Sequence, residues 1–341
     1  ADFSLIALFL LSLGLGLGGL YLATREALFS PATYAPTELS TGLLALAVVM
    51  LLALWGAPVV KLMVLARAQG IRVAPGNAFM AHVAQVFGSA MTPSGTGGGP
   101  LLLLALERVG VPAGTGLGIA VQLFVLDLAT LGVLIPVGLV YLLAVSPIAL
   151  SPLLSWLAGA AALVALAGSV ALVLFPRPLT RLIHALSRWR PLARFARGLK
   201  RMAGDYHASA RAFRGMPFAT WLGLLAVNLA AWLANFALFW ALLAMYGAQV
   251  KLLDVLSVLS IITLFAFFVP TPGASGVLEL LLGLGLSGGA QSSIAAPVLW
   301  WRAGTFYLAY LLGPICAWVL LAHNPPKWLR RRRRTDSSGA A

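Results

Sequence analysis

Charged residues are scarce in this sequence. Asp, Glu, Lys and Arg together make up 9% of the 341 residues, whereas hydrophobic residues make up 61%. A soluble domain carries roughly 25% charged residues, so the composition excludes an ordinary soluble protein. Apolar runs of about 20 residues recur, which is the length that crosses the ~30 Å hydrocarbon core of a bilayer. The sequence therefore predicts a single all-α polytopic membrane domain over 1–341.

Cysteine is nearly absent, and the motifs of soluble enzymes are missing. The single cysteine, Cys316, lies in an apolar run, so the sequence offers neither a disulfide framework nor a cysteine-based metal site. It contains no G-x-x-x-x-G-K-[ST] phosphate loop and no H-E-x-x-H zinc motif. We therefore expect no cofactor and no metal, and a transporter-like protein rather than an enzyme.

Basic residues outnumber acidic ones, and they are concentrated in two segments. Residues 177–214 hold ten of the 23 Lys and Arg residues, and 324–341 holds six more. The positive-inside rule places both the linker 176–217 and the tail 324–341 in the cytoplasm. Apolar residues in 179–202 recur at roughly helical spacing between arginines. We expect amphipathic helices there, and contact of the linker and tail with anionic lipid rather than nucleic acid.

Apolar runs and Pro/Gly-rich breaks give the expected order of segments. Six runs are predicted to cross the membrane completely: 4–23, 40–66, 114–144, 150–175, 218–245 and 291–322. The first lacks a basic n-region and a clear cleavage site, so it is expected to be a retained span. Two further segments, 76–107 and 252–286, each consist of two short limbs around a turn, which describes a re-entrant helical hairpin. Pro136 leaves open whether 114–144 is one helix or two.

Charge placement decides between hairpins and complete crossings. Both basic segments reach the cytoplasm if 76–107 and 252–286 each return to the face from which they came. The N- and C-termini are then cytoplasmic, and the two halves form an inverted-topology repeat in the cytoplasmic membrane. "TPSGTG" at 92–97 and "TPGASG" at 271–276 lie 179 residues apart, which supports such a repeat. Interrupted segments at matching positions indicate a transporter site near the midplane. Nothing in this pattern predicts an oligomeric state.

The two turns supply candidate ligand groups. A helix that begins inside the membrane presents free N–H groups and the positive end of its dipole, which suits an anionic headgroup. Hydroxyl groups at such a turn either bind this ligand or cap the half-helix. The substrate-binding candidates at the turns are Thr92, Ser94, Thr96, Gly97, Gly98, Thr271, Gly273, Ser275 and Gly276.

Ionisable residues within apolar segments complete the candidate site, because charge at membrane depth is costly and usually functional. We expect Arg302 to bind a phosphate group, with Glu279 as its partner or as a proton carrier; alternatively, these two form a fixed ion pair. Asp127, in the middle of 114–144, is either a binding residue or a buried counter-charge. Lys61, Arg67 and Arg72 are interpreted as placing the 67–76 loop on the cytoplasmic side. No residue is assigned a catalytic role.

Four stretches carry a resemblance to a known family: "VFGSAMTPSGTGGGP" (86–100), "LERVGVP" (106–112), "FVPTPGASGVLE" (268–279) and "VLWWRAG" (298–304). They resemble the motifs of the lysylphosphatidylglycerol synthase transmembrane-region family of flippase-like membrane proteins, over essentially the whole chain. The resemblance places Glu279 and Arg302 on the family's acidic and basic motif positions, and Asp127 near an acidic one. The sequence departs from the family at Gly99, where a polar residue is usual.

The resemblance implies movement or handling of lipid. No counterpart of the family's aminoacyltransferase domain occurs in this sequence, so it does not imply aminoacyl transfer. We expect translocation of a phospholipid, or of another phosphate-bearing lipid such as a polyprenyl phosphate. Two alternatives stay open at this point: a non-catalytic membrane subunit that presents lipid to a partner enzyme, and a membrane-embedded enzyme that acts on lipid headgroups.

Overall fold

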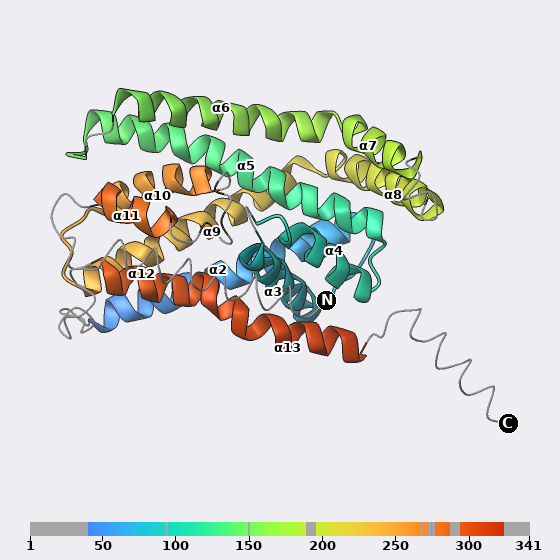
Figure 1. Ribbon diagram of the computed structural model, residues 1–341, viewed down its shortest axis with the longest axis horizontal. Helices are drawn as coiled ribbons and strands as arrows, with labels where there is room; N and C mark the ends of the chain where they lie inside the picture. Colours follow the sequence, from blue (N-terminus) through green and yellow to red (C-terminus); the bar gives the residue numbers. More distant parts are fainter. Residues whose placement is uncertain are drawn as a thin grey trace.

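The chain folds into a bundle of helices (Figure 1). The computed structural model describes residues 40–92, 95–148, 151–188, 196–266, 269, 271, 274, 277–286 and 294–323, and no strand occurs among them. The helices are α2 (Thr41–Ala68), α3 (Pro75–Met91), α4 (Gly98–Arg108), α5 (Ala113–Ala144), α6 (Pro152–Leu174), α7 (Arg177–Arg188), α8 (Ala196–Arg214), α9 (Phe218–Met245), α10 (Leu252–Ala266), α11 (Val277–Leu286), α12 (Ala295–Arg302), the π-helical segment η4 (Ala303–Tyr307) and α13 (Leu308–His323). The predicted all-α membrane fold is confirmed.

Among the described residues, four helices are long and apolar enough to cross a bilayer, namely α2, α5, α6 and α9. They coincide with four of the predicted spans. Helix α5 runs through Pro136 without a break, because a transmembrane helix tolerates a proline where neighbouring helices surround it. The predicted span 291–322 corresponds to α12, η4 and α13, which follow one another directly. The predicted span 4–23 and the basic tail 324–341 lie outside the described residues.

The surface of α6 shows why the bundle needs lipid around it. Leu153, Trp156, Leu163 and Val164 each expose two thirds or more of their surface. Contiguous apolar surface of this extent is unfavourable in water, whereas it is matched by lipid tails. On the opposite face, small residues such as Ala158 and Ala162 are buried against α5, where they allow the two helices to approach closely.

The two interrupted segments lie toward opposite ends of the bundle. Helices α3 and α4 pack against each other near the end that carries α7 and α8, while α10 and α11 pack together toward the other end (Figure 1). This arrangement is the one that two hairpins entering from opposite faces require. The orientation of the bundle in a membrane, with cytoplasmic termini, stays a prediction.

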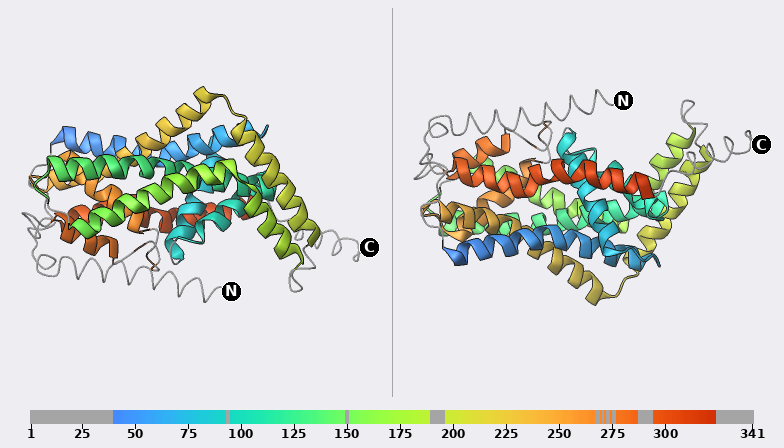
Figure 2. Two further views of the ribbon diagram at one scale, coloured as in Figure 1. Left: turned by 90° about the horizontal axis from the view of Figure 1, so that it is seen from above. Right: turned by 90° about the horizontal axis from the view of Figure 1, so that it is seen from below.

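The basic linker forms the helices α7 and α8, which pack on each other at one end of the bundle (Figure 2). Tyr206 and Phe213 of α8 are buried, and α8 also packs along α5. Burial raises the pKa of the Tyr206 phenol. The exposed basic residues of the pair are Arg177, Arg181, Arg188, Arg197, Lys200, Arg201, Arg211 and Arg214. The linker is thus amphipathic, with its apolar side on the bundle and its cations outward.

Candidate functional site: a polar cavity among four helices

A half-open cavity of about 250 Å³ lies among α2, α3, α5 and α9. Its lining residues are Leu54, Pro58, Lys61, Leu62, His82, Gln85, Val86, Ser89, Leu123, Asp127, Ala231, Trp232 and Asn235. Ligand pockets for small molecules typically have ~300–1,000 Å³. The cavity therefore has room for a polar headgroup but not for a whole diacyl lipid.

The cavity lies at membrane depth. Asp127 is near the middle of the 32-residue helix α5, about 21 Å from its first residue at a rise of ~1.5 Å per residue. Lys61 is 5% exposed and lies within the apolar helix α2. Charged side chains at this depth are rare and mark ligand pathways more often than they stabilise a fold.

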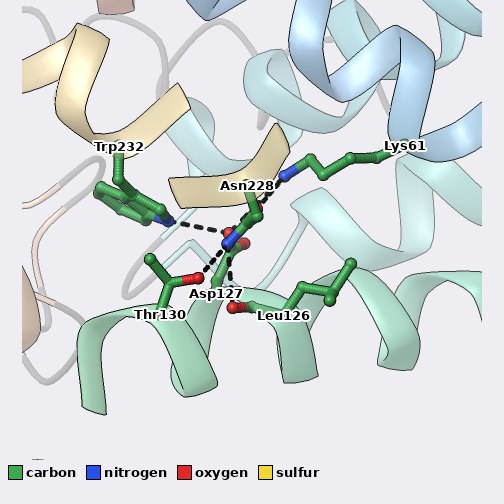
Figure 3. A network of polar contacts seen from close by, with 6 residues as sticks. All are labelled: Lys61, Leu126, Asp127, Thr130, Asn228 and Trp232. Carbon is green, nitrogen blue, oxygen red and sulfur yellow. Dashed lines mark hydrogen bonds and ion pairs between the residues drawn. The ribbon is translucent and has the colours of Figure 1, made fainter. Parts of the chain in front are cut away.

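Lys61 and Asp127 form the charged centre of the site (Figure 3). Their Nζ and Oδ1 atoms are 3.8 Å apart. Lys61 also donates a hydrogen bond to Asn228 Oδ1, and Trp232 donates its indole N–H to Asp127 Oδ1 at 3.1 Å. Each charge is thus also held by a neutral group from α9, which reduces the desolvation cost of keeping two ions inside the bundle.

Asn228 is fixed in turn by helix α5. It is fully buried, and its Nδ2 donates to the backbone oxygen of Leu126 at 2.9 Å and to Thr130 Oγ1 at 2.8 Å. These bonds identify the amide's orientation, because Oδ1 is then left to accept from Lys61. Figure 3 shows the side chains of α2, α5 and α9 converging at this point.

Helix α3, the first limb of the first hairpin, supplies a polar wall. His82, Gln85 and Ser89 all line the cavity, and their spacing of three and four residues places them on one face of the helix. His82 also packs edge-on against Trp55, with 5.6 Å between the ring centroids. The hairpin thus turns its polar face toward the Lys61–Asp127 pair.

The first turn is closed by its own side chains. Thr92 donates its hydroxyl to the backbone oxygen of Gly88 at 2.8 Å and accepts from the Gly97 N–H at 2.6 Å. A Cβ atom on Gly98 would lie 2.0 Å from Ser89 Oγ, and one on Gly97 would lie 2.6 Å from the Thr92 methyl group. Thr92, Gly97 and Gly98 therefore shape the hairpin, and their predicted contact with a ligand stays a prediction. Thr96 is exposed.

Arg302 is buried at the end of α12, with 5% of its surface exposed. Its guanidinium lies 5.6 Å from the ring centroid of Trp301 and 4.9 Å from that of Phe306. Trp301 donates its indole N–H to Asn235 Oδ1 at 3.1 Å, and Asn235 lines the cavity. The predicted phosphate-binding arginine thus directly follows a residue that is hydrogen-bonded to the cavity wall. Asp127 is among the lining residues, whereas Arg302 is not.

The π-helical segment η4 follows Arg302 directly. Trp55 of α2 donates its indole N–H to the backbone oxygen of Gly304 at 3.0 Å, and Thr305 donates to that of Trp301 at 2.7 Å. Insertions of π-helix often occur at functional sites, because they free backbone carbonyl groups and re-aim side chains. Here one such carbonyl binds the same Trp55 that packs on His82.

Several predicted site residues are outside the described part of the chain. Ser94, Gly273, Ser275 and Gly276 are not among the described residues, and Thr271 is half-buried. Glu279 belongs to α11, but its side chain lies outside the described residues. The predicted relationship between Glu279 and Arg302 therefore stays a prediction.

The structure adds residues that the sequence analysis missed. Lys61 is buried against Asp127, so Arg67 and Arg72 are the exposed members of the three basic residues at that end of α2. The cytoplasmic placement of the 67–76 loop stays a prediction. Asn228, Trp232 and Asn235 recur at spacings of four and three on the apolar helix α9. Polar groups that share one face of a transmembrane helix are a signal for an internal site.

Comparison with known proteins agrees with this picture. A model of the lysylphosphatidylglycerol synthase TM region matches residues 7–313. A search among curated proteins found no match. The matched range includes every helix that lines the cavity, together with Arg302 and η4. Because the match spans most of the chain, this multi-pass membrane protein belongs to the lysylphosphatidylglycerol synthase TM-region family.

Proposed function

We propose that this protein translocates a lipid with a phosphate-bearing headgroup, a phospholipid or a polyprenyl phosphate, between the leaflets of the cytoplasmic membrane. Membership of a family that takes its name from the membrane region of a lipid-modifying synthase supports a role in lipid handling. The observation that carries the proposal is the cavity at membrane depth whose lining residues include the charged pair Lys61 and Asp127.

The size and lining of the cavity support movement of a headgroup through the protein. Its volume of about 250 Å³ accommodates a headgroup, while the acyl chains stay in the surrounding lipid. Lys61 offers a cation for the phosphate, and Gln85 and Ser89 offer hydrogen bonds in place of water. Such a path lowers the barrier that a charged headgroup meets in the apolar core of a bilayer.

Arg302 and the two turns are proposed to act on the same headgroup along its path. Arg302 lies next to Trp301, which is hydrogen-bonded to the cavity residue Asn235. A phosphate that leaves Lys61 toward α12 would therefore meet a second cation. Glu279 is proposed as the partner of Arg302 or as a proton carrier that couples movement to a gradient.

The exposed cations of α7 and α8 are proposed to bind anionic lipid headgroups. Eight basic side chains face outward on these two helices, and each Lys or Arg near an anionic membrane surface contributes ~1 kcal/mol. This contact would hold the linker at one membrane face, from which α8 supports the start of α5.

The proposal is tested with purified protein in liposomes that contain lipids labelled on the acyl chain. The measurement is the rate at which label in the inner leaflet becomes accessible to a membrane-impermeant quencher. We expect fast exchange with the wild type and at least a tenfold slower rate with Asp127→Asn and with Arg302→Ala. Glu107→Gln is the matched control, because this acidic residue is exposed at the end of α4.

Two outcomes would contradict translocation by the protein alone. Absence of exchange for several phospholipids and a polyprenyl phosphate, with and without a proton gradient, would favour a subunit that presents lipid to a partner enzyme. Formation of a chemically altered headgroup by the purified protein would favour a membrane-embedded enzyme.

A further inference from the structure

The charges around the cavity are balanced. Among its lining residues, Lys61 carries one positive charge and Asp127 one negative charge, so their sum is zero with His82 counted as neutral. Transfer of a net charge from water into an apolar environment is strongly unfavourable unless the charge is paired there. If a ligand with a single net charge binds, the complex of cavity and ligand therefore contains one unpaired charge.

The distance between the two charges leaves room for a ligand to pair with both. A direct charge-assisted N–H···O bond measures ~2.7–2.9 Å, whereas Lys61 Nζ and Asp127 Oδ1 are 3.8 Å apart. The direct hydrogen-bond partner of Lys61 is the neutral Asn228. The pair is therefore close enough to be mutually stabilising, yet a ligand can insert without breaking a short ion pair.

Each charge also keeps hydrogen-bonding capacity. In the described part of the chain, Lys61 and Trp232 both contact Oδ1 of Asp127, which leaves Oδ2 as an acceptor. The ammonium of Lys61 has three N–H donors, and its partners in the described part of the chain are Asn228 and Asp127. The side chain of Asp127 is 30% exposed, compared with 7% for Lys61, so the carboxylate is the more accessible member of the pair.

We propose that the cavity selects a net-neutral, zwitterionic headgroup, whose phosphate binds Lys61 while its primary ammonium binds Asp127. This inference rests on the proposed function and names its substrate class. The dipole of such a headgroup aligns antiparallel to the Lys61–Asp127 dipole, so all four charges are paired. An anionic headgroup pairs with Lys61 but is repelled by Asp127, so it binds more weakly.

The test measures binding, which is independent of translocation. The probes are dihexanoyl phosphatidylethanolamine, which is zwitterionic, and dihexanoyl phosphatidylglycerol, which is anionic. The two lipids have the same acyl chains and the same phosphate, and they differ in the alcohol that is esterified to the phosphate. Each is titrated into the purified protein in a non-ionic detergent, and the apparent Kd is obtained from the rise in melting temperature. We expect the ethanolamine lipid to bind the wild type about tenfold more tightly, which corresponds to ~1.4 kcal/mol.

Removal of one charge should change the preference between the two lipids, which would not happen if the ion pair were merely structural. Asp127→Asn leaves a net positive cavity, so the glycerol lipid should now bind more tightly than the ethanolamine lipid. Lys61→Met removes the phosphate partner and should weaken both probes at least tenfold. Asp127→Glu keeps the charge and should keep the wild-type preference, and Glu107→Gln should behave as wild type.

The wild-type comparison alone can overturn the inference, so it does not depend on the variants folding. Equal or tighter binding of the glycerol lipid by the wild type contradicts it, and so does an unchanged preference in a folded Asp127→Asn variant. If the binding preference holds but liposomes show no exchange, translocation fails while the ligand class stands. If lipids exchange but the preference is absent, the ligand class fails and translocation stands.

Discussion

Trp301 donates its indole N–H to Asn235 across the interface of α12 and α9 at 3.1 Å. This bond joins the residue before Arg302 to the wall of the cavity that holds Asp127. It therefore connects the two places that the sequence analysis singled out in different parts of the chain. Trp301 is thus the link between α12, which ends at Arg302, and the lining residue Asn235.

The Trp301–Asn235 bond should contribute measurably to stability. We expect a coupling of about 0.6 kcal/mol in a double-mutant cycle of Trp301→Phe and Asn235→Leu, the average for hydrogen bonds between transmembrane helices. The free energy of unfolding in mixed micelles provides the measurement. A coupling indistinguishable from zero would show that the two side chains do not interact in solution.

The Lys61–Asp127 pair should be costly to break from one side only. Lys61→Met and Asp127→Leu should each destabilise the protein by about 3 kcal/mol, since removal of one partner of a buried ion pair typically costs ~3–5 kcal/mol and Asp127 is partly exposed. The double variant should be less destabilised than the sum of the single variants, because it leaves no unpaired charge. If the two single changes in the free energy of unfolding add up exactly to that of the double variant, Lys61 and Asp127 do not interact.

The first hairpin should depend on the absence of a side chain at Gly98. Gly98→Ala would place a Cβ atom 2.0 Å from Ser89 Oγ and 3.0 Å from the backbone oxygen of Gln85, and overpacking of this kind costs ~1–3 kcal/mol. Gly99→Ala is the matched control, because no atom lies within 4 Å of its Cβ position. Thermal unfolding of the two variants provides the comparison. Equal melting temperatures would mean that α3 and α4 do not approach as closely as described.

The contact of α5 with α8 should be equally sensitive at Gly118. A Cβ atom there would lie 2.5 Å from Ser209 Cβ, and Ser209 Oγ accepts a hydrogen bond from Gln122 at 3.0 Å. Gly118→Ala should therefore destabilise the protein. Gly204→Ala, at an open position on α8, should stabilise it by up to ~1 kcal/mol, because alanine loses less backbone entropy in a helix. Changes of opposite sign in the free energy of unfolding of the two variants would confirm that α8 packs against α5.

The outward cations of α7 and α8 should recruit anionic lipid. In a triple variant with Arg181→Gln, Arg197→Gln and Lys200→Gln, we expect a smaller share of anionic lipid among the lipids that remain bound after purification. Lipid analysis by mass spectrometry provides the measurement. The triple variant Arg67→Gln, Arg72→Gln, Arg108→Gln removes the same charge from outside the linker and serves as the control. An unchanged lipid profile in the linker variant would contradict the proposed membrane contact.

The class of fold and the order of its segments can be predicted from the sequence. Apolar length and Pro/Gly-rich breaks are local properties, and a bilayer admits few backbone solutions other than the helix. The helices α2, α5, α6 and α9 and the interrupted pair α3–α4 can therefore be predicted from the positions of apolar runs and breaks along the chain. Asp127 was also identified in this way, because a charge at membrane depth is conspicuous in any apolar run.

Which polar groups meet depends on how the helices pack, and this cannot be read from the sequence. Lys61 and Asn228 are 167 positions apart, and nothing in either helix specifies that α2 packs along α9. The pairing of Lys61 with Asp127 was therefore not predicted, although the low dielectric of the interior favours it. Thr92 and Gly98 were placed at the turn of a hairpin, but their contacts with Gly88 and Ser89 are seen only in the packed structure. Partner choice is decided by helix packing, since shape and the cost of an unpaired charge act between segments that are remote in sequence.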